Sequence, residues 1–272
     1  MIDLHLHTTA SDGSLPPAAL VARAAEAGIS TLAVTDHDTI AGLAEASAAA
    51  AGQGVTFVNG IEITAIEASR DVHVLGYFFD PGNAALAGFL VKQRLDRVRR
   101  VEEIAARLAS AGYRVDVAHL VGDGAVHGRS IGRPHVADAL IAAGHVRNRD
   151  EAFDRFLGHG RPAFVPRCGA SAAEVVRVLN EAGGVASLAH PGLTRVDELI
   201  PSLAAAGLGA LEVRHSDHDV ETEARYRALA AFHRLAVSGG SDFHADDSAR
   251  APKLGLMTLS IEELRALEAR RA

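Results

Sequence analysis

Short apolar runs alternate with helical patterns along most of the chain, and this alternation limits the fold more than any other feature. The runs at 2–7 and 31–35 are each followed by an Ala-rich helical stretch, and prolines at 16 and 17 with Gly28 mark the first helix. A repeated order of strand then helix favours a mainly parallel sheet over a β-sandwich. The 272 residues, 48% of them hydrophobic, suffice for one large domain.

The segment 81–166 interrupts this rhythm. It contains a long helical pattern at 85–111, a glycine-rich stretch at 122–128 that we expect to form a loop, and two shorter helical stretches. The alternation resumes afterwards, with apolar runs at 185–188, 210–213 and 235–238. We therefore expect a single α/β domain over residues 1–272 with a mainly helical insertion at about 81–166.

Histidine and acidic residues gather at the ends of the expected strands. His5 and His7 alternate along the first strand, so both side chains point to one face, roughly 6.6 Å apart. Asp12 follows in a loop where Gly13 permits a tight turn. Six of the fourteen histidines occur in such short motifs with carboxylates. This distribution is the main functional signal in the sequence.

The remaining motifs follow later strands. Polar residues close or open apolar runs at Thr35-Asp36-His37-Asp38, Glu62, His73, Ala189-His190-Pro191 and Ser241-Asp242-Phe243-His244. The carboxyl ends of parallel strands meet at one face of a barrel or wound sheet, so most of these groups should converge. His73 fits this geometry less well because it stands at the start of its run.

Buried carboxylates and imidazoles of this number need cations to compensate their charges and lone pairs. The single cysteine, Cys168, can form neither an internal disulfide nor a thiolate metal site, and we expect it to be a small buried side chain. Imidazole and oxygen ligands without sulfur suit Mn, Fe or Zn. We expect no disulfide-linked partner.

The charge is distributed unevenly. The chain has a net charge of −7, but between Lys92 and Arg167 there are 14 Lys and Arg residues against 9 Asp and Glu residues. An acidic body with a basic segment is expected if carboxylates collect metals and arginines bind an anionic substrate. About half of these arginines would equally suit solvated helix faces. No apolar run is long enough for a membrane span and no secretion signal precedes the first strand, so we expect a cytoplasmic protein without membrane contact.

The motifs resemble those of the PHP (polymerase and histidinol phosphatase) family over nearly the whole chain. The resemblance implies a distorted (β/α)7 barrel and three divalent metal ions per chain, with manganese favoured over iron or zinc. It places His5, His7, Glu62 and Asp242 on one ion, Asp12, His37 and His244 on a second, and His190, His73 and the shared Glu62 on the third. Asp36 would position these ligands or cap the following helix, and both roles remain open.

Within the family, the insertion is similar to that of bacterial enzymes of the ribonuclease AM type, which hydrolyse nucleoside 3′,5′-bisphosphates and short oligonucleotides from the 5′ end. Arg97 and Arg100 share a helix face and could reach one phosphate. The resemblance implies substrate contacts for Arg97, Arg100, Arg133, His135 and Arg161. His215 and His218 could line the pocket or lie on the surface, and we leave them outside the site together with His119, His127, His145, His159 and His233.

The implied reaction is hydrolysis of a phosphomonoester, with a metal-bridging hydroxide attacking phosphorus. No side chain is assigned as a catalytic residue, and the group that protonates the leaving oxygen stays open. One alternative is a histidinol phosphatase or another small-molecule phosphatase. A second is a non-catalytic metal-binding module, against which the complete ligand set argues. The absence of a Gly-x-Ser-x-Gly motif disfavours a serine nucleophile.

Overall fold

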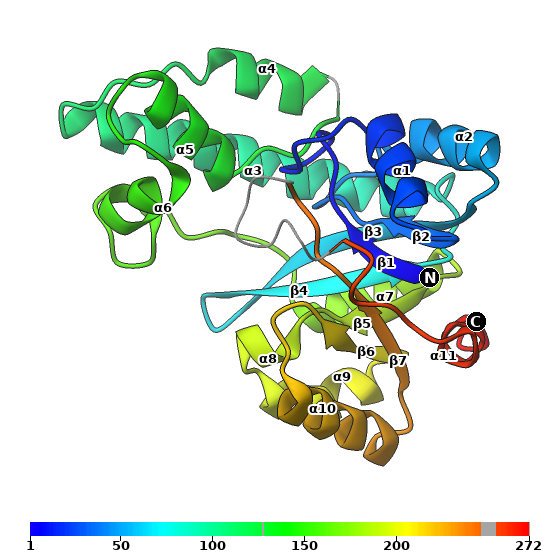
Figure 1. Ribbon diagram of the computed structural model, residues 1–272. Helices are drawn as coiled ribbons and strands as arrows, with labels where there is room; N and C mark the ends of the chain where they lie inside the picture. Colours follow the sequence, from blue (N-terminus) through cyan, green and yellow to red (C-terminus); the bar gives the residue numbers. More distant parts are fainter. Residues whose placement is uncertain (127, 246–253, 272) are drawn as a thin grey trace.

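A seven-stranded sheet that nearly closes into a barrel forms the centre of the computed structural model, which describes residues 1–126, 128–245 and 254–271 (Figure 1). The first and last strands meet where the backbone N–H of His7 donates to the carbonyl of Phe243, at 3.0 Å. The strands occur in the sheet in chain order: β1 (Ile2–Leu6), β2 (Thr31–Val34), β3 (Thr56–Glu67), β4 (Arg70–Tyr77), β5 (Val185–Leu188), β6 (Ala210–His215) and β7 (Ala236–Gly240). The predicted distorted barrel is confirmed.

The distortion is the reversed strand β4. Strands β1 to β3 are parallel, as are β5 to β7, whereas β4 is antiparallel to both of its neighbours. The start of β4 therefore lies at the barrel end where the other strands finish, and His73 pairs with Thr64 of β3. This reversal places His73 beside the other strand-end residues, which a purely parallel sheet would not do.

Helices cover the outside of the barrel. The apolar faces of most of them pack on one set of buried side chains of the sheet, whereas α11 packs with a second set that includes Leu4 and Leu75. The first helix ends just before Gly28, whose φ of +82° suits a helix stop. The covering helices are α1 (Pro17–Glu26), α2 (Leu43–Gln53), α7 (Ala172–Glu181), α8 (Pro191–Thr194), η2 (Asp197–Leu199), α9 (Ile200–Ala205), α10 (Val220–Phe232) and α11 (Ile261–Glu268).

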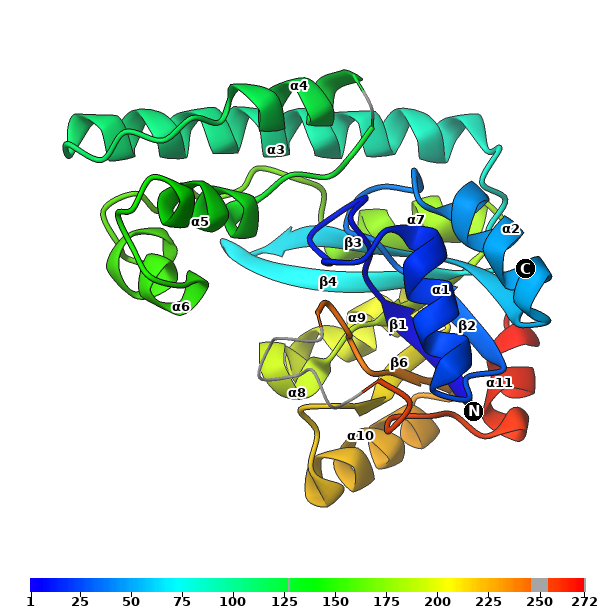
Figure 2. The same ribbon diagram turned by 45° about the horizontal axis from the view of Figure 1, so that its top comes forward.

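The segment between β4 and α7 forms a helical lobe beside the barrel (Figures 1 and 2). Its long helix spans both parts, and side chains such as Ile104 and Leu140 build a second hydrophobic cluster within the lobe. The glycine-rich stretch predicted as a loop is helical as far as Val126, because packing on the long helix outweighs the poor helix propensity of glycine. The lobe contains α3 (Ala84–Ser110), α4 (Ala118–Val126), α5 (Arg133–Ala142), α6 (Arg149–Ala152) and η1 (Phe153–Leu157).

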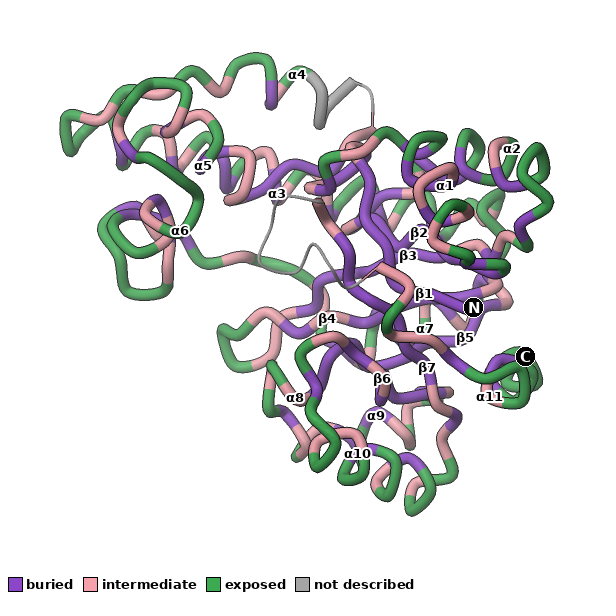
Figure 3. Tube along the Cα trace, viewed as in Figure 1, coloured by how far each residue is buried: buried purple, intermediate pink, exposed green. Residues whose placement is uncertain are grey.

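Burial follows this architecture: the strands are buried, whereas the lobe and the outer helices expose one side (Figure 3). Cys168 is exposed, which corrects the expectation of a buried thiol, because it lies in the irregular segment leading from the lobe to α7. Among the described residues, no helix has both the length and the apolar character required to cross a membrane.

Candidate metal centre

The structure brings all nine predicted metal ligands together at one end of the barrel. Most follow the carboxyl ends of parallel strands, and the reversed β4 adds His73 from its first half. Glu62 lies within β3, which extends past the end of β2 and forms a bridge with His37. The clustered residues are His5, His7, Asp12, His37, Glu62, His73, His190, Asp242 and His244.

The Glu62 carboxylate occupies the middle of this cluster and is almost completely buried. Its Oε2 lies 3.1 Å from Nδ1 of His37 and 3.3 Å from Nε2 of His7. Its Oε1 lies 2.8 Å from Nδ1 of His73 and 3.0 Å from Nε2 of His190. A carboxylate with both oxygens surrounded by imidazoles is suited to bridge neighbouring metal ions.

Two aspartates flank the cluster. Asp12 Oδ1 lies 3.3 Å from Nε2 of His244, and its Oδ2 lies 3.7 Å from Nε2 of His37. Asp242 Oδ1 lies 3.3 Å from Nε2 of His7 and 3.4 Å from Nδ1 of His244. Among the described residues, four sets could each hold an ion: His7 with Asp12, His37 and His244; His5 with His7 and Asp242; His37 with Glu62 and His73; and His5 with Glu212 and His215.

The buried donor atoms fit divalent metal ions. Nε2 of His5, both ring nitrogens of His7 and one ring nitrogen each of His37 and His190 have no hydrogen-bond partner among the described residues. Several lie close to carboxylate oxygens without hydrogen-bond geometry. Buried polar atoms are normally satisfied, so these orphaned nitrogens indicate ligands that need cations.

The electrostatics of the metal-free cluster agree with this interpretation. Burial would raise the pKa of Glu62, but the imidazoles of His37 and His73 hold that pKa well below its usual range. Burial would lower the pKa of His7, yet the nearby carboxylates of Asp242 and Glu62 raise it to about 10. Burial lowers the pKa of His37 to about 3. Shifts of this size in a group of packed imidazoles and carboxylates mark the cluster as a candidate functional site.

Asp36 positions the loop that carries Asp12. Its Oδ1 accepts from the backbone N–H of Thr8 at 2.8 Å and from the Ser11 hydroxyl at 2.6 Å, and its Oδ2 accepts from the Thr8 hydroxyl at 2.6 Å. Helix α2 begins at a Gly42 cap without a side-chain hydrogen bond. Of the two roles left open by the sequence, Asp36 therefore fulfils the positioning role.

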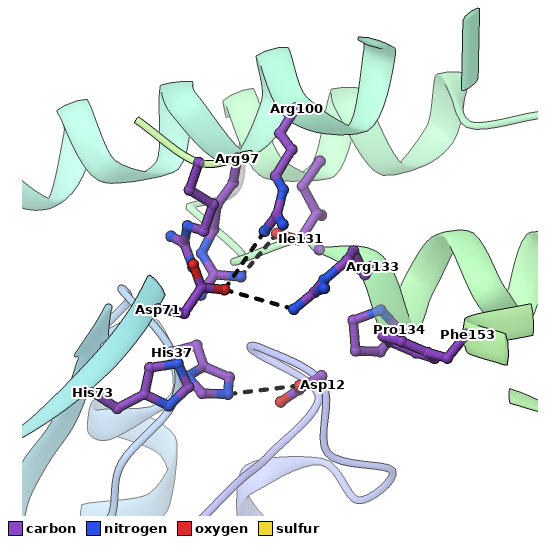
Figure 4. Close-up of a pocket in the computed structure, with 12 residues that line it drawn as sticks. Asp12, His37, Asp71, His73, Arg97, Arg100, Ile131, Arg133, Pro134 and Phe153 are labelled. Atoms are coloured by element: carbon purple, nitrogen blue, oxygen red, sulfur yellow. Dashed lines mark hydrogen bonds and ion pairs between the residues drawn. The ribbon is translucent and has the colours of Figure 1, made fainter. Parts of the chain in front are cut away.

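A pocket with arginine walls opens above the metal ligands (Figure 4). Arg97 and Arg100 descend from α3, and Arg133 points inward from α5 toward Asp71. On the opposite side, the pocket is bounded by Asp12, His37, His73 and Asp71, and Arg167 completes its wall. The pocket is therefore shared by candidate metal ligands of the barrel and basic residues of the helical lobe.

Arg97 is held by a partner that the sequence prediction missed. Asp38 Oδ2 accepts from Nε of Arg97 at 2.6 Å and from Arg167 at 2.9 Å. Burial would raise the pKa of Asp38, but these two guanidinium groups hold it well below its usual range. Asp38 was visible in the second motif, yet nothing local in the sequence indicated that its partners lie 59 and 129 residues away.

Arg100 and Arg133 are less fully paired. Arg100 donates from Nε to the carbonyl of Val165 at 2.8 Å. Asp71 lies 4.0 Å from Arg100 and 3.6 Å from Arg133, distances that are longer than hydrogen bonds. Burial, followed by repulsion from Arg133, lowers the pKa of Arg100 to about 9. Two guanidinium groups in this setting are suited to bind a phosphate.

The structure does not bring the other two predicted substrate contacts into this pocket. His135 is tied elsewhere, because its Nε2 lies 2.8 Å from the carbonyl of Ser11 and its Nδ1 accepts from the N–H of Gly132. It faces a separate hollow between α4 and α5. Arg161 is exposed in the turn after η1. Their assignment to the substrate stays a prediction that this placement does not support.

The metal cluster and the barrel agree with the comparison to known families, in which the model described as "PHP domain" matches residues 3–143. This chain belongs to the PHP domain family. Its membership also follows from relatives that align with it over most of their length. The expected family resemblance is thereby confirmed.

Three relatives of the PHP protein have assigned activities. It is 38% identical to a 3′,5′-nucleoside bisphosphate phosphatase of Chromobacterium violaceum, over 90% of this chain and 87% of the relative. It is 36% identical to a 5′-3′ exoribonuclease of Haemophilus influenzae, over 89% of each chain. It is 37% identical to a phosphoribosyl 1,2-cyclic phosphate 1,2-diphosphodiesterase of Eggerthella lenta, over 93% of this chain and 97% of the relative.

A solved structure resembles the PHP protein along its whole length. A candidate metal-dependent phosphoesterase from Bifidobacterium adolescentis superposes with a TM-score of 0.88 at 34% sequence identity. The alignment covers 100% of this chain and 96% of that chain. The helical lobe is therefore a shared part of both structures and not an addition peculiar to this sequence.

Two residues of β6 lie against the ligands although sequence reasoning left them outside the site: it missed Glu212, and for His215 it left a pocket or a surface position open. Glu212 is completely buried, and its carboxylate lies 2.8 Å from Nδ1 of His5. His215 is also buried, with Nε2 3.3 Å from Asp242 Oδ2. A signal for Glu212 was available, because a charged residue inside a short apolar strand requires a buried partner. His218, nearly buried, hydrogen-bonds through Nδ1 to a backbone carbonyl of β6.

Proposed function

We propose that this PHP protein hydrolyses a phosphomonoester in nucleotides that carry a second phosphate, namely nucleoside 3′,5′-bisphosphates and the 5′ ends of short oligonucleotides. One observation carries the proposal: Arg100 and Arg133 face the same pocket as the metal ligands Asp12, His37 and His73. The assigned activities of the Chromobacterium and Haemophilus relatives support it.

We further propose three divalent ions per chain, with manganese favoured and iron or zinc as alternatives, held as the family resemblance assigns them. The overlapping candidate ligand sets and the orphaned imidazole nitrogens support more than one ion. Divalent ions supply Lewis acidity toward phosphoryl oxygens and activate water at neutral pH. The protein contributes the arrangement of ligands, and no side chain is assigned as a general acid.

The arginines of the lobe bind and orient the substrate. Arg100 and Arg133 hold the phosphate that does not react, and this fixes the distance of the scissile phosphate from the barrel ligands. Arg97 and Arg167, locked by Asp38, form a rigid wall behind them. Residues 84–157 thus serve as the substrate-binding cap of a single PHP domain.

The charge pattern outside the pocket favours a short substrate. Five arginines on the surface of the lobe pair with four carboxylates of the lobe itself, so most of their charge is compensated: Arg99, Arg107, Arg147, Arg149 and Arg155. A long nucleic acid would need an open cationic track along the surface. The pocket arginines suffice for one additional phosphate.

A second candidate function is cleavage of a cyclic phosphodiester on a phosphorylated ribose. The Eggerthella relative, named for this activity, is about as similar to this chain as the Chromobacterium phosphatase and aligns over more of its length. The same arginines could hold the phosphate at the other end of such a sugar. Histidinol phosphate, a third substrate, offers an imidazole and no second anion to this pocket.

A substrate panel tests these functions. Metal-quantified protein is assayed with adenosine 3′,5′-bisphosphate, a 5′-phosphorylated dinucleotide, phosphoribosyl 1,2-cyclic phosphate and histidinol phosphate at one ionic strength. We expect the highest kcat/KM for the bisphosphate. A preference for the cyclic phosphate would transfer the assignment to the second candidate. Turnover of none of the four by metal-loaded protein would indicate a non-catalytic module.

A further inference from the structure

Glu212 connects two separate parts of the metal centre. It lies in the middle of β6 and is completely buried. Its Oε1 is 2.8 Å from Nδ1 of the His5 ring, and its Oε2 accepts from the backbone N–H of His190 at 2.7 Å. The two residues that it touches are separated by 185 positions in the chain and belong to different strand-end motifs.

The first contact determines which nitrogen of His5 can bind a metal. A carboxylate only accepts hydrogen bonds, so Nδ1 of His5 must carry the proton. Nε2 then presents its lone pair toward the cluster, where it lacks a hydrogen-bond partner and lies 3.4 Å from Glu62 and from Asp242. This is the carboxylate–imidazole arrangement that orients metal-binding histidines.

The second contact holds a strained backbone. His190 has φ +28° and ψ +56°, a left-handed conformation that is costly for a residue with a side chain. The Glu212 hydrogen bond fixes the N–H of this residue, and the His190 ring reaches Glu62 at 3.0 Å. One carboxylate thus controls a side-chain tautomer on one side of the centre and a backbone turn on the other.

We propose that Glu212 is a positioning residue that presents His5 and His190 to the metal ions without binding a metal itself. The inference rests on the proposed metal dependence and not on the identity of the substrate. His5, Glu212 and His215 also lie close enough together to form a ligand set of their own. We favour positioning, because Nδ1 of His215 accepts from the backbone of Asp217 and both Glu212 oxygens are engaged.

Glutamine at this position cannot reproduce both contacts. An amide has one accepting oxygen and one donating nitrogen, whereas the two partners of Glu212 are both donors. If the oxygen stays on the His190 N–H, the amide nitrogen donates to Nδ1 of His5 and moves the ring proton to Nε2, where a metal should bind. If the amide oxygen instead faces His5, the amide nitrogen faces the backbone N–H of His190, and both of these groups are donors.

The experiment compares Glu212→Gln with Glu67→Gln as a matched control. Glu67, the last residue of β3, also accepts a backbone N–H, from Ala172 at 2.8 Å, and among the described residues it belongs to none of the candidate ligand sets. Metal-free proteins are titrated with Mn²⁺ in a chelator buffer, and bound metal is counted by elemental analysis. We expect Glu67→Gln to match wild type and Glu212→Gln to need about 10- to 100-fold more free Mn²⁺ for half-saturation.

The number of ions at saturation separates positioning from ligation. We expect Glu212→Gln to reach the wild-type stoichiometry at high Mn²⁺, whereas one ion fewer would show that Glu212 is a ligand and overturn the inference. An affinity within threefold of wild type would overturn it as well. If Glu212→Gln does not fold by circular dichroism, Glu212→Asp takes its place; its shorter side chain cannot span both partners, so the same two outcomes apply. The titration measures metal binding and needs no substrate, so its result can be interpreted even if the protein turns over none of the four substrates of the panel.

Discussion

Asp38 Oδ2 lies 2.6 Å from Nε of Arg97, and this contact anchors the helical lobe to the metal centre. Asp38 follows the candidate metal ligand His37 directly, and Arg97 lies on α3, the long helix of the lobe. Arg167, at the exit of the lobe, donates to the same oxygen at 2.9 Å. The middle of α3 and the exit of the lobe are thus both held by one buried carboxylate next to a candidate ligand.

Replacement of Asp38 by Asn should destabilise the protein by about 3–5 kcal/mol, because it leaves buried guanidinium charges without a partner. The depressed pKa of Asp38 means that its stabilisation is fully present above the ordinary value of 3.8 and is lost only as the pH falls through the depressed value. The difference from wild type in urea unfolding should therefore be constant above about pH 5.

Asp138→Asn provides the control for this measurement. Asp138 pairs with Arg149 at 2.6 Å, but both side chains are about half exposed. Such a pair contributes roughly 0–1 kcal/mol. An equal loss of stability in the two variants would contradict a structural role for the buried pair.

Arg133→Ala should reduce kcat/KM for adenosine 3′,5′-bisphosphate by about 1.5–3 kcal/mol, the range for a hydrogen bond to a charged group, which corresponds to roughly tenfold or more. The same change should hardly affect p-nitrophenyl phosphate, which offers no second phosphate. Arg161 is exposed, so Arg161→Ala should leave kcat/KM unchanged for both substrates. Equal losses on both substrates in Arg133→Ala would show that this arginine serves the reacting phosphate or the fold.

Asp71→Asn should strengthen binding of the second phosphate, because Asp71 faces Arg100 and Arg133 in the pocket and repels an incoming anion. A partly exposed charge of this kind changes binding by roughly 0.5–1 kcal/mol, so KM for the bisphosphate should fall about two- to fivefold at low salt. The effect should shrink at high ionic strength. A rise in KM would mean that Asp71 accepts a hydrogen bond from a substrate hydroxyl.

Metal uptake should release protons and strengthen as the pH rises. In the metal-free protein the pKa of His7 is raised to about 10, so its ring is protonated at neutral pH and must lose that proton to bind an ion. Calorimetric titration in two buffers of different ionisation enthalpy measures the protons released. We expect affinity for Mn²⁺ to increase from about pH 6 to about pH 9. Uptake without proton release, or at most one ion per active chain, would contradict the proposed cluster.

The raised pKa of His7 also predicts how the stability of the metal-free protein changes with pH. A raised folded-state pKa contributes stability that is fully present below the ordinary value of 6.5 and is lost as the pH rises toward 10. The Tm of metal-free protein should therefore fall between about pH 7 and about pH 10, while the Tm of metal-loaded protein falls less. Parallel curves for the two forms would show that His7 does not carry the proton.

The sequence by itself determined most elements of the fold, and through its family resemblance it predicted the nine candidate ligands that the structure brings together. Period-two alternation places His5 and His7 on one face of β1, and helix periodicity brings Arg97 and Arg100 to one side of α3. These are local properties, because they depend on residues a few positions apart. The convergence of strand ends then follows from parallel pairing alone.

Only the tertiary structure decided which distant groups meet. The reversal of β4 brings His73 to the ligands, Asp38 neutralises Arg97, and Glu212 joins His5 to His190. The sequence likewise did not predict three further features: the helical packing of α4, the hydrogen bonds of the His135 ring and the exposure of Arg161. The physical reason is that each depends on contacts between segments distant in the chain, whose pairing is chosen by the packing of the whole core and not by local periodicity.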